Sequence, residues 1–305
     1  MYQSISLKLL LFMQNFEQKM FQFFLGEKTK QKIEKSILYI SIVSFLIHLI
    51  LIYLVKFEIV RFEDGYGLFT NPITAIYTPF SFILLYEIYL LVYYLPRSIT
   101  TYISKQYEII TLIIIRRIFK DISNLNLSES LFTNEVNVKI FIDLGASLVL
   151  FLLIYLFRKN TLLPKTNSTG DNIEKFIRIK RWMSSLLIPT LILLGLFNFI
   201  PWVSSLYDAN FGLLEMSSVN NIFFDEFFQL LIIVDVMLLI FSFFNSDLFH
   251  KIMRNSGFII STILIRVSFL TEGLTNVILI ISSLIFGLLI LLIYNECEKN
   301  ELFKP

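Results

Sequence analysis

The sequence predicts an all-α fold: a polytopic α-helical membrane protein with about eight transmembrane helices in two tandem four-helix repeats, preceded by an N-terminal amphipathic helix. Of 305 residues, 56% are hydrophobic and 16% are charged, which is too apolar for a soluble domain of this length. The apolar residues lie in blocks of about 17 to 25, the length that a helix needs to cross a bilayer. Runs such as 148–157 are apolar on every face, which excludes the alternating pattern of barrel strands.

The third observation behind this prediction is a repeated stretch. Residues 109–116 form an aliphatic run closed by Arg116, and residues 259–266 form a similar run closed by Arg266. An arginine in an apolar run is costly to place in lipid. Two such arginines, 150 residues apart, therefore indicate a feature that the fold uses.

The first 32 residues are expected to form the amphipathic helix. Apolar residues recur there at spacings of three and four, with polar residues between them: Leu9, Leu10, Phe12, Met13, Phe16, Met20, Phe21 and Phe24. The apolar run 9–13 is short for a signal peptide, and no small-residue cleavage site follows it. Two placements remain open for this helix: the cytoplasmic interface of the membrane, or the side of the helical bundle.

Eight candidate spans follow the amphipathic helix. The third and the seventh are the least apolar, and the third includes Lys105, Glu108, Arg116 and Arg117. It either crosses the membrane or is only half inserted. The expected spans are residues 37–55, 73–95, 99–118, 137–157, 184–204, 222–243, 256–273 and 275–295.

The distribution of lysine and arginine predicts the orientation. The connection 158–183 holds seven basic residues and the connection 205–221 holds none, so the positive-inside rule places 158–183 in the cytoplasm. Both termini then lie in the cytoplasm, as does the connection 244–255. The basic residues Arg116, Arg117 and Lys120 are the exception, because they follow the third span on the opposite side.

The internal repeat rests on polar matches that keep their order. Aligning Arg116 with Arg266 brings Glu87 opposite Asp235 with a slip of two residues, and the glycine-containing stretches 66–68 and 211–213 also correspond. Four spans in each unit make the repeat a parallel one, related by an axis along the membrane normal. The expected division is 1–32 for the amphipathic helix, 33–158 for the first unit, 159–178 for a basic cytoplasmic linker, 179–297 for the second unit and 298–305 for a cytoplasmic tail.

Charged residues inside the spans are the candidate functional residues, because ionisable groups in lipid are costly unless they are paired or used. Partners can be assigned by matching the depths of residues counted from the ends of the spans. The expected pairs are Glu87 with Lys105, Asp235 with Arg254 or Lys251, Arg116 with Asp143, and Arg266 with Asp225 or Glu226. The pairs are either static salt bridges that fix helix register, or part of a polar path.

His48 lies midway along the first span, in an otherwise apolar run. It is either an interior histidine hydrogen-bonded to a neighbouring helix or a proton relay. The sequence holds no motif of a hydrolase, a nucleotide-binding loop or a metal site, so we expect no enzyme activity, no cofactor and no metal. The single cysteine, Cys297, excludes an intramolecular disulfide.

Two functions are compatible with these features. The first is movement of a small ion or solute along the intramembrane charges, and the second is a membrane-embedded scaffold or sensor that binds anionic lipid or a cytoplasmic protein. Membrane lipid is the expected partner, nucleic acid is not, and a homo-oligomer is left open. Charges that face a hydrated cleft would favour the first function. A dry core in which Glu87, Asp235 and both arginines are directly paired would favour the second.

Overall fold

The computed structural model describes residues 15–60, 72–122, 135–161, 171–205, 216–244, 249–271 and 273–299. Every regular element in these ranges is a helix, and no strand occurs within them. A helical segment at 15–25 precedes α2 (Glu27–Lys56), the short 3-10 helix η1 (Pro72–Ile76), α3 (Tyr77–Tyr93), α4 (Ile99–Ile122), α5 (Glu135–Thr161), α6 (Asp171–Ser205), α7 (Met216–Phe244), α8 (Phe249–Phe269) and α9 (Gly273–Lys299).

The fold is that of an α-helical membrane protein. Among the described residues, seven helical segments are long and apolar enough to cross a membrane, as judged by length and composition. They are Asn15–Lys56, Pro72–Tyr93, Asn137–Thr161, Phe176–Phe197, Glu226–Phe244, Phe249–Phe269 and Gly273–Lys299.

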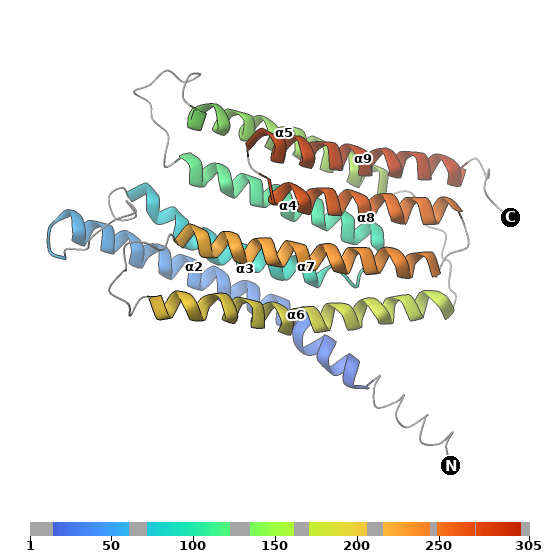
Figure 1. The fold of residues 1–305 in the computed structure, drawn as a ribbon, viewed down its shortest axis with the longest axis horizontal. Helices are drawn as coiled ribbons and strands as arrows, with labels where there is room; N and C mark the ends of the chain where they lie inside the picture. Colours follow the sequence, from blue (N-terminus) through green and yellow to red (C-terminus); the bar gives the residue numbers. More distant parts are fainter. Residues whose placement is uncertain are drawn as a thin grey trace, which may run out of the picture.

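The helices form two layers (Figure 1). Helices α2 to α5 contact one another in chain order, and so do α6 to α9. The layers meet where α5 contacts α9, α4 contacts α8 and α3 contacts α6. The facing helices α5 and α9 run in the same direction, as do α4 and α8, and the segment 15–25 lies toward the same end of the bundle as the last residues of α9.

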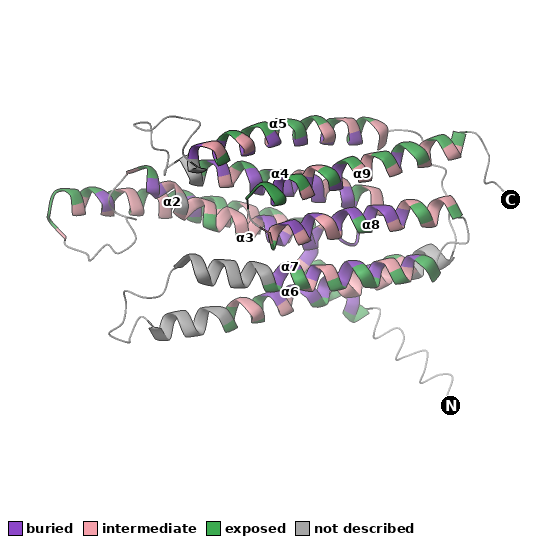
Figure 2. Ribbon diagram, turned by 45° about the horizontal axis from the view of Figure 1, so that its top comes forward, coloured by how far each residue is buried: buried purple, intermediate pink, exposed green. Residues whose placement is uncertain are grey.

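Burial follows this layered arrangement (Figure 2). Helix α8 has one face of buried residues toward α4 and α9, whereas α2 buries only Ser41 and Ile52 in its whole length. The outer surface of α2 and α5 exposes large apolar side chains, for example Tyr39 at 72% and Leu148 at 73%. Such a surface is unfavourable in water and suits contact with lipid tails.

Helix α4 is the one long described helix that is not apolar enough to be assigned as a span from composition. Its 24 residues reach about 36 Å, which exceeds the roughly 30 Å of a hydrocarbon core. It nevertheless lies between α3 and α5 and against α8, inside the bundle. Four of its charged side chains have acidic or basic partners there, which explains why a polar helix occupies a central position: Lys105, Glu108, Arg116 and Arg117.

Small residues bring α8 and α9 close together. Gly257 of α8 lies against Ile290 of α9, and a Cβ atom built on Gly287 would lie 1.9 Å from the hydroxyl of Tyr107. Ser261 and Ser283 bond each other's backbone carbonyls across the same interface, at 2.8 and 2.9 Å. Small residues at four-residue spacing allow this approach, as is common between helices in membranes.

Each of the eight expected spans overlaps a long helix, and the second also includes η1, but the expected domain boundaries fall inside helices, because α5 runs to Thr161 and α9 to Lys299. Helix α2 begins at Glu27 and runs through the expected boundary between residues 32 and 33. Helix α6 begins at Asp171, so the second part of the expected linker 159–178 is helical. The expected apolar residues 9–13 and the two glycine stretches 66–68 and 211–213 lie outside the described residues.

Candidate functional site

A cluster of polar side chains lies where α4, α7 and α8 meet. We define the central polar cluster as Tyr102 and Gln106 of α4, Asp235 of α7, and Thr262 and Arg266 of α8. The two α4 residues are four positions apart, and so are the two α8 residues, so each pair lies on one face of its helix. The two faces point toward Asp235.

The side chains of the central polar cluster form hydrogen bonds with one another. Asp235 accepts hydrogen bonds from Tyr102 Oη at 2.9 Å, from Thr262 Oγ1 at 2.8 Å and from Arg266 Nη1. Arg266 Nη2 donates to Tyr102 Oη at 2.8 Å and to Gln106 Oε1 at 3.4 Å. Asp235 is 0% exposed and Arg266 is 1% exposed. This is a directly paired acid and base with no open surface.

Lys180 of α6 lies at one end of this region and is 2% exposed. Its ammonium donates to the backbone carbonyl of Arg97, in the turn between α3 and α4. Carbonyls beyond a helix end have no partner inside the helix, so a cation there satisfies one of them and suits the dipole of α3. Lys180 thereby ties α6 to the first layer.

A second buried pair joins Glu87 of α3 to Arg116 of α4. The carboxylate Oε2 and the guanidinium Nη1 are 2.9 Å apart, and the side chains are 5% and 13% exposed. Arg116 Nη1 also lies 3.3 Å from the carbonyl of Phe80. The positions that the repeat alignment matched, Glu87 with Asp235 and Arg116 with Arg266, thus form equivalent acid–arginine pairs, one in each layer.

The expected pairing of Glu87 with Lys105 is wrong, and so is that of Asp235 with Arg254 or Lys251. Depth counting assumed that neighbouring helices start at the same level. Gln106 Nε2 instead bonds the carbonyl of Leu91 at 3.2 Å, so residue 106 of α4 lies beside residue 91 of α3. Side chains also lean toward the N-terminus of their helix, so an acid and an arginine on antiparallel helices lean toward each other.

The expected pairing of Arg116 with Asp143 is wrong by one residue. Arg117 donates to both oxygens of Asp143, at 2.9 and 2.8 Å, and to Asn276 Oδ1 of α9 at 2.9 Å. Consecutive helical residues point about 100° apart, so Arg116 faces α3 while Arg117 faces α5. We call Arg117, Asp143 and Asn276 the Arg117 cluster; it joins both layers through α4, α5 and α9.

Arg266 does not pair with Glu226 as expected, because Asp235 holds its guanidinium. Glu226 is exposed, and the side chain of Asp225 lies outside the described residues. Arg254 of α8 lies over the ring of Tyr294, 4.3 Å from its centroid, and bonds Asn255 Oδ1.

Lys105 binds Glu108 on its own helix at 2.6 Å. The other oxygen of Glu108 lies 3.3 Å from Arg158 of α5, so this pair sits at the more accessible end of the α4–α5 contact. His48 of α2 shares a hydrogen bond with the hydroxyl of Thr78 on α3. That contact matches the interior-histidine interpretation of the sequence.

Sequence reasoning missed six residues that complete these clusters: Tyr102, Gln106, Arg117, Lys180, Thr262 and Asn276. Spacing was the usable signal for one of them, Thr262, because a polar residue four positions from an intramembrane charge lies on the same helix face. Thr262 stands in that relation to Arg266. Tyr102, Gln106 and Lys180 bond partners from other helices, which spacing in one segment does not reveal.

Within the described residues, no group of three or more His, Cys, Asp or Glu side chains is arranged to hold a metal ion. Comparison with known protein families, with curated proteins and with solved structures gave no match to this chain. The interpretation of its function therefore rests on the geometry of the bundle and its charges.

Proposed function

We propose that the chain is a multi-pass membrane protein that acts as a scaffold or sensor and does not transport. The observation that carries this proposal is the central polar cluster, in which Asp235 and Arg266 are completely buried and bonded to each other. A path for ions needs water or mobile groups at its charges, whereas charges held by several partners fix the register of the helices. A groove of about 690 Å³ on the side of the bundle is lined mostly by apolar side chains and does not include these groups.

We further propose that α4 is an eighth span, so that the two layers are two parallel four-helix repeats. The segment 15–25 and the last residues of α9 lie toward the same end of the bundle, which requires an even number of crossings between them. The acid–arginine pairs on α3–α4 and on α7–α8 support the repeat, because equivalent positions carry them. Chance similarity between aliphatic stretches would not place a paired acid and base at both sites.

The distribution of basic residues supports cytoplasmic termini. They gather where α2, α4, α6 and α8 begin and where α5 and α9 end, as the positive-inside rule expects of the cytoplasmic side. These residues are Lys28, Lys30, Lys32, Lys35, Arg97, Lys105, Arg158, Lys159, Arg178, Arg181, Lys251 and Lys299. Within the described ranges, the opposite end holds fewer basic residues: Lys56 at the end of α2 and Lys139 near the start of α5 lie there, whereas Arg116, Arg117 and Arg266 are paired with acids in the bundle and do not count as loop charges.

A second candidate function is movement of a small ion or proton. It is favoured by a line of hydrogen-bonding side chains along α4: Tyr102, Gln106, Tyr107, Thr111, Arg116 and Arg117. Tyr107 bonds Ser261 at 2.6 Å, which extends the line to α8. Side chains that are hydrogen-bonded directly to one another can pass on an ion or a proton only if they exchange their hydrogen-bond partners.

Reconstitution distinguishes the two candidates. Purified protein in liposomes should give no potassium, sodium, chloride or proton flux above protein-free liposomes, and Asp235→Asn should lower the melting temperature because Arg266 loses its counter-ion. A flux in the unmodified protein that Asp235→Asn abolishes, at an unchanged melting temperature, contradicts the scaffold proposal and supports transport.

A further inference from the structure

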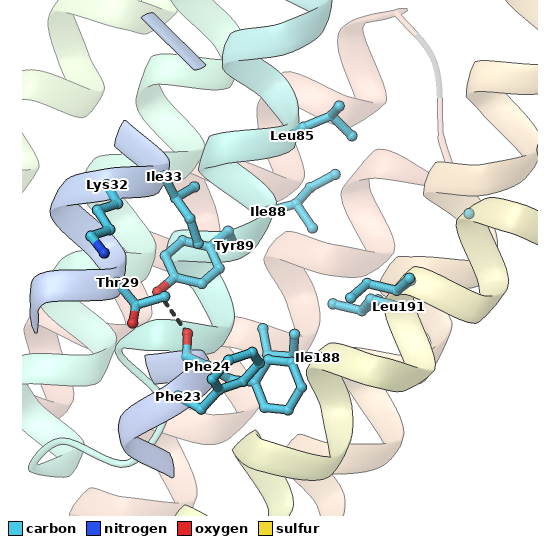
Figure 3. A pocket seen from close by; sticks show the side chains of 12 residues that line it. Phe23, Phe24, Thr29, Lys32, Ile33, Leu85, Ile88, Tyr89, Ile188 and Leu191 are labelled. Carbon is cyan, nitrogen blue, oxygen red and sulfur yellow. Dashed lines mark hydrogen bonds between the residues drawn. The ribbon is translucent and has the colours of Figure 1, made fainter. Parts of the chain in front are cut away.

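A groove opens on the side of the bundle between the segment 15–25, α2, α3 and α6 (Figure 3). Its volume is about 690 Å³, within the roughly 300–1,000 Å³ typical of ligand sites. The lining is apolar apart from one end: Phe23, Phe24, Ile33, Leu85, Ile88, Tyr89, Ile188, Leu191, Ile192 and Gly195, with Thr29 and Lys32 at the start of α2. The groove therefore has a long apolar part and a short polar end.

The aromatic wall of the groove is fixed in place. Tyr89 donates a hydrogen bond from its hydroxyl to the carbonyl of Phe24 at 2.9 Å, so α3 holds the chain just before the break at Gly26. Phe23 is 70% exposed and packs edge-on against Phe24, with ring centroids 4.9 Å apart. An exposed phenylalanine beside an apolar groove is suited to contact with a hydrocarbon chain.

The polar end of the groove is cationic because the nearby acids already have partners on α2 or α3. Glu27 accepts a hydrogen bond from Tyr93, and Glu34 accepts one from Tyr86 at 2.9 Å, so α3 binds both carboxylates. Lys30 pairs with Glu27 at 3.7 Å. Lys32 is exposed and forms no ion pair with the described residues, so its ammonium is available at the rim.

We propose that this groove binds one anionic phospholipid, with an acyl chain along the apolar lining and the phosphate at Lys32. A hydrocarbon chain matches the lining, and a single anionic group matches the single cation at the end. The inference rests on the proposed cytoplasmic position of the N-terminus, because that leaflet surface carries anionic lipid. It extends the proposed scaffold or sensor function by naming the lipid class to which the bundle would respond.

The test is native mass spectrometry of the purified full chain in detergent, titrated with dioleoyl phosphatidylglycerol or with dioleoyl phosphatidylcholine. The two lipids have the same chains, so a difference in affinity reports the headgroup. We expect one phosphatidylglycerol per chain, bound about fivefold more tightly than phosphatidylcholine, because one lysine near the membrane surface contributes about 1 kcal/mol. Glycerol 3-phosphate, which has the phosphate without the chains, should not bind.

Two variants with matched controls locate the site. Lys32→Gln should reduce the affinity for phosphatidylglycerol to that for phosphatidylcholine, whereas Lys35→Gln, an exposed lysine of α2 outside the groove, should not. Ile192→Trp, at a half-exposed lining position, should prevent binding of both lipids. Leu193→Trp, at a similarly exposed position outside the lining, should leave binding unchanged.

Three outcomes overturn the proposal: equal affinity of the unmodified protein for the two lipids, equal effects of Lys32→Gln and Lys35→Gln, or full binding by Ile192→Trp. Equally tight binding of oleate would also overturn it, because a fatty acid lacks the phosphate. The liposome flux assay tests the scaffold function separately from the lipid site. A flux contradicts the scaffold function and leaves the lipid site standing, whereas loss of headgroup preference in a protein without flux contradicts only the lipid site.

Discussion

Arg266 shows how a single charged residue is accommodated in the core. It is one of the largest fully buried side chains among the described residues. Its guanidinium presents five N–H donors, and it bonds the carbonyl of Leu231 at 2.6 Å as well as Asp235, Tyr102 and Gln106. The energetic consequence is asymmetric: the intact pair contributes little net stability, whereas removing one partner leaves an uncompensated buried charge.

The Arg117 cluster provides a direct test of this asymmetry. Asp143→Asn should destabilise the protein by about 3–5 kcal/mol, because Asp143 is 1% exposed and Arg117 would lose a two-bond partner. Replacing both residues by leucine should recover most of the loss. The melting temperature of the purified variants in detergent measures both effects.

An exposed ion pair serves as the control for the buried one. Arg158 is 61% exposed and lies 3.3 Å from Glu108, so Arg158→Gln should cost no more than about 1 kcal/mol. A loss in Asp143→Asn that is no larger than the loss in Arg158→Gln would mean that the Arg117 cluster is solvated and does not hold the layers together.

Tyr102 links the acid and the base of the central polar cluster. Its hydroxyl donates to Asp235 and accepts from Arg266, so Tyr102→Phe removes two hydrogen bonds and leaves buried polar atoms unsatisfied. We expect a loss of about 1–3 kcal/mol in unfolding free energy. Tyr39→Phe, on the exposed face of α2, should be neutral. Equal melting temperatures for the two variants would show that the hydroxyl of Tyr102 is dispensable.

The sequence indicated which charged residues matter but not how they pair. Glu87, Arg116, Asp143, Asp235 and Arg266 were all expected to be paired in the membrane, and all are paired. Their partners depend on the stagger and rotation of neighbouring helices, which residue counting cannot supply. The repeat alignment contained the better clue, because an acid and an arginine that recur together are natural partners.

At the level of helices, the apolar blocks predicted the positions of eight helices, seven of which are long and apolar enough to cross a membrane, because block length is a property of the sequence alone. Helix α4 was the difficult case. Its charges left open whether it crosses the membrane or is only half inserted, and in the structure it packs between α3 and α5 and against α8, with its arginines paired to acids. Composition describes a helix in isolation. It therefore underestimates how well a helix fits inside a bundle when neighbouring helices neutralise its charges.

The contact of α4, α8 and α9 depends on a glycine. Gly287→Ala places a Cβ atom 1.9 Å from Tyr107 Oη and 3.1 Å from Ser261 Oγ, so either the Tyr107 side chain or the helices must shift. We expect destabilisation of about 1–3 kcal/mol, the usual cost of overpacking. Adding Tyr107→Phe should restore part of it, because the hydroxyl is the nearest atom.

Gly145→Ala is the matched control for this substitution. It also lies within a helix, but nothing approaches its Cβ position within 4 Å. Alanine is favoured over glycine in a helix by up to about 1 kcal/mol, so this variant should be neutral or slightly stabilised. If thermal melting showed the two alanine variants to be alike, close packing at Gly287 would not be what holds α9 against α4.

At the level of the whole molecule, the two layers explain why the charges recur. Each layer has an acid on its second helix and an arginine on its third, and the two layers contact each other where α5 meets α9, α4 meets α8 and α3 meets α6. The acid–arginine pairs therefore join helices within a layer. Bonds across the layers come from Tyr102 and Gln106 to the Asp235–Arg266 pair, from the Arg117 cluster and from Lys180.

Membrane topology tests the whole arrangement. In a Cys297→Ser background, single cysteines at residues 98 and 128, which precede and follow α4, should react with a membrane-impermeant maleimide from opposite sides of the membrane. Cysteines at residues 170 and 212 should likewise label from opposite sides, with residues 98 and 170 on the cytoplasmic side. Labelling of 98 and 128 from one side would mean that α4 does not cross. That outcome would leave seven crossings, place the termini on opposite sides, and remove the basis for two equivalent four-helix layers.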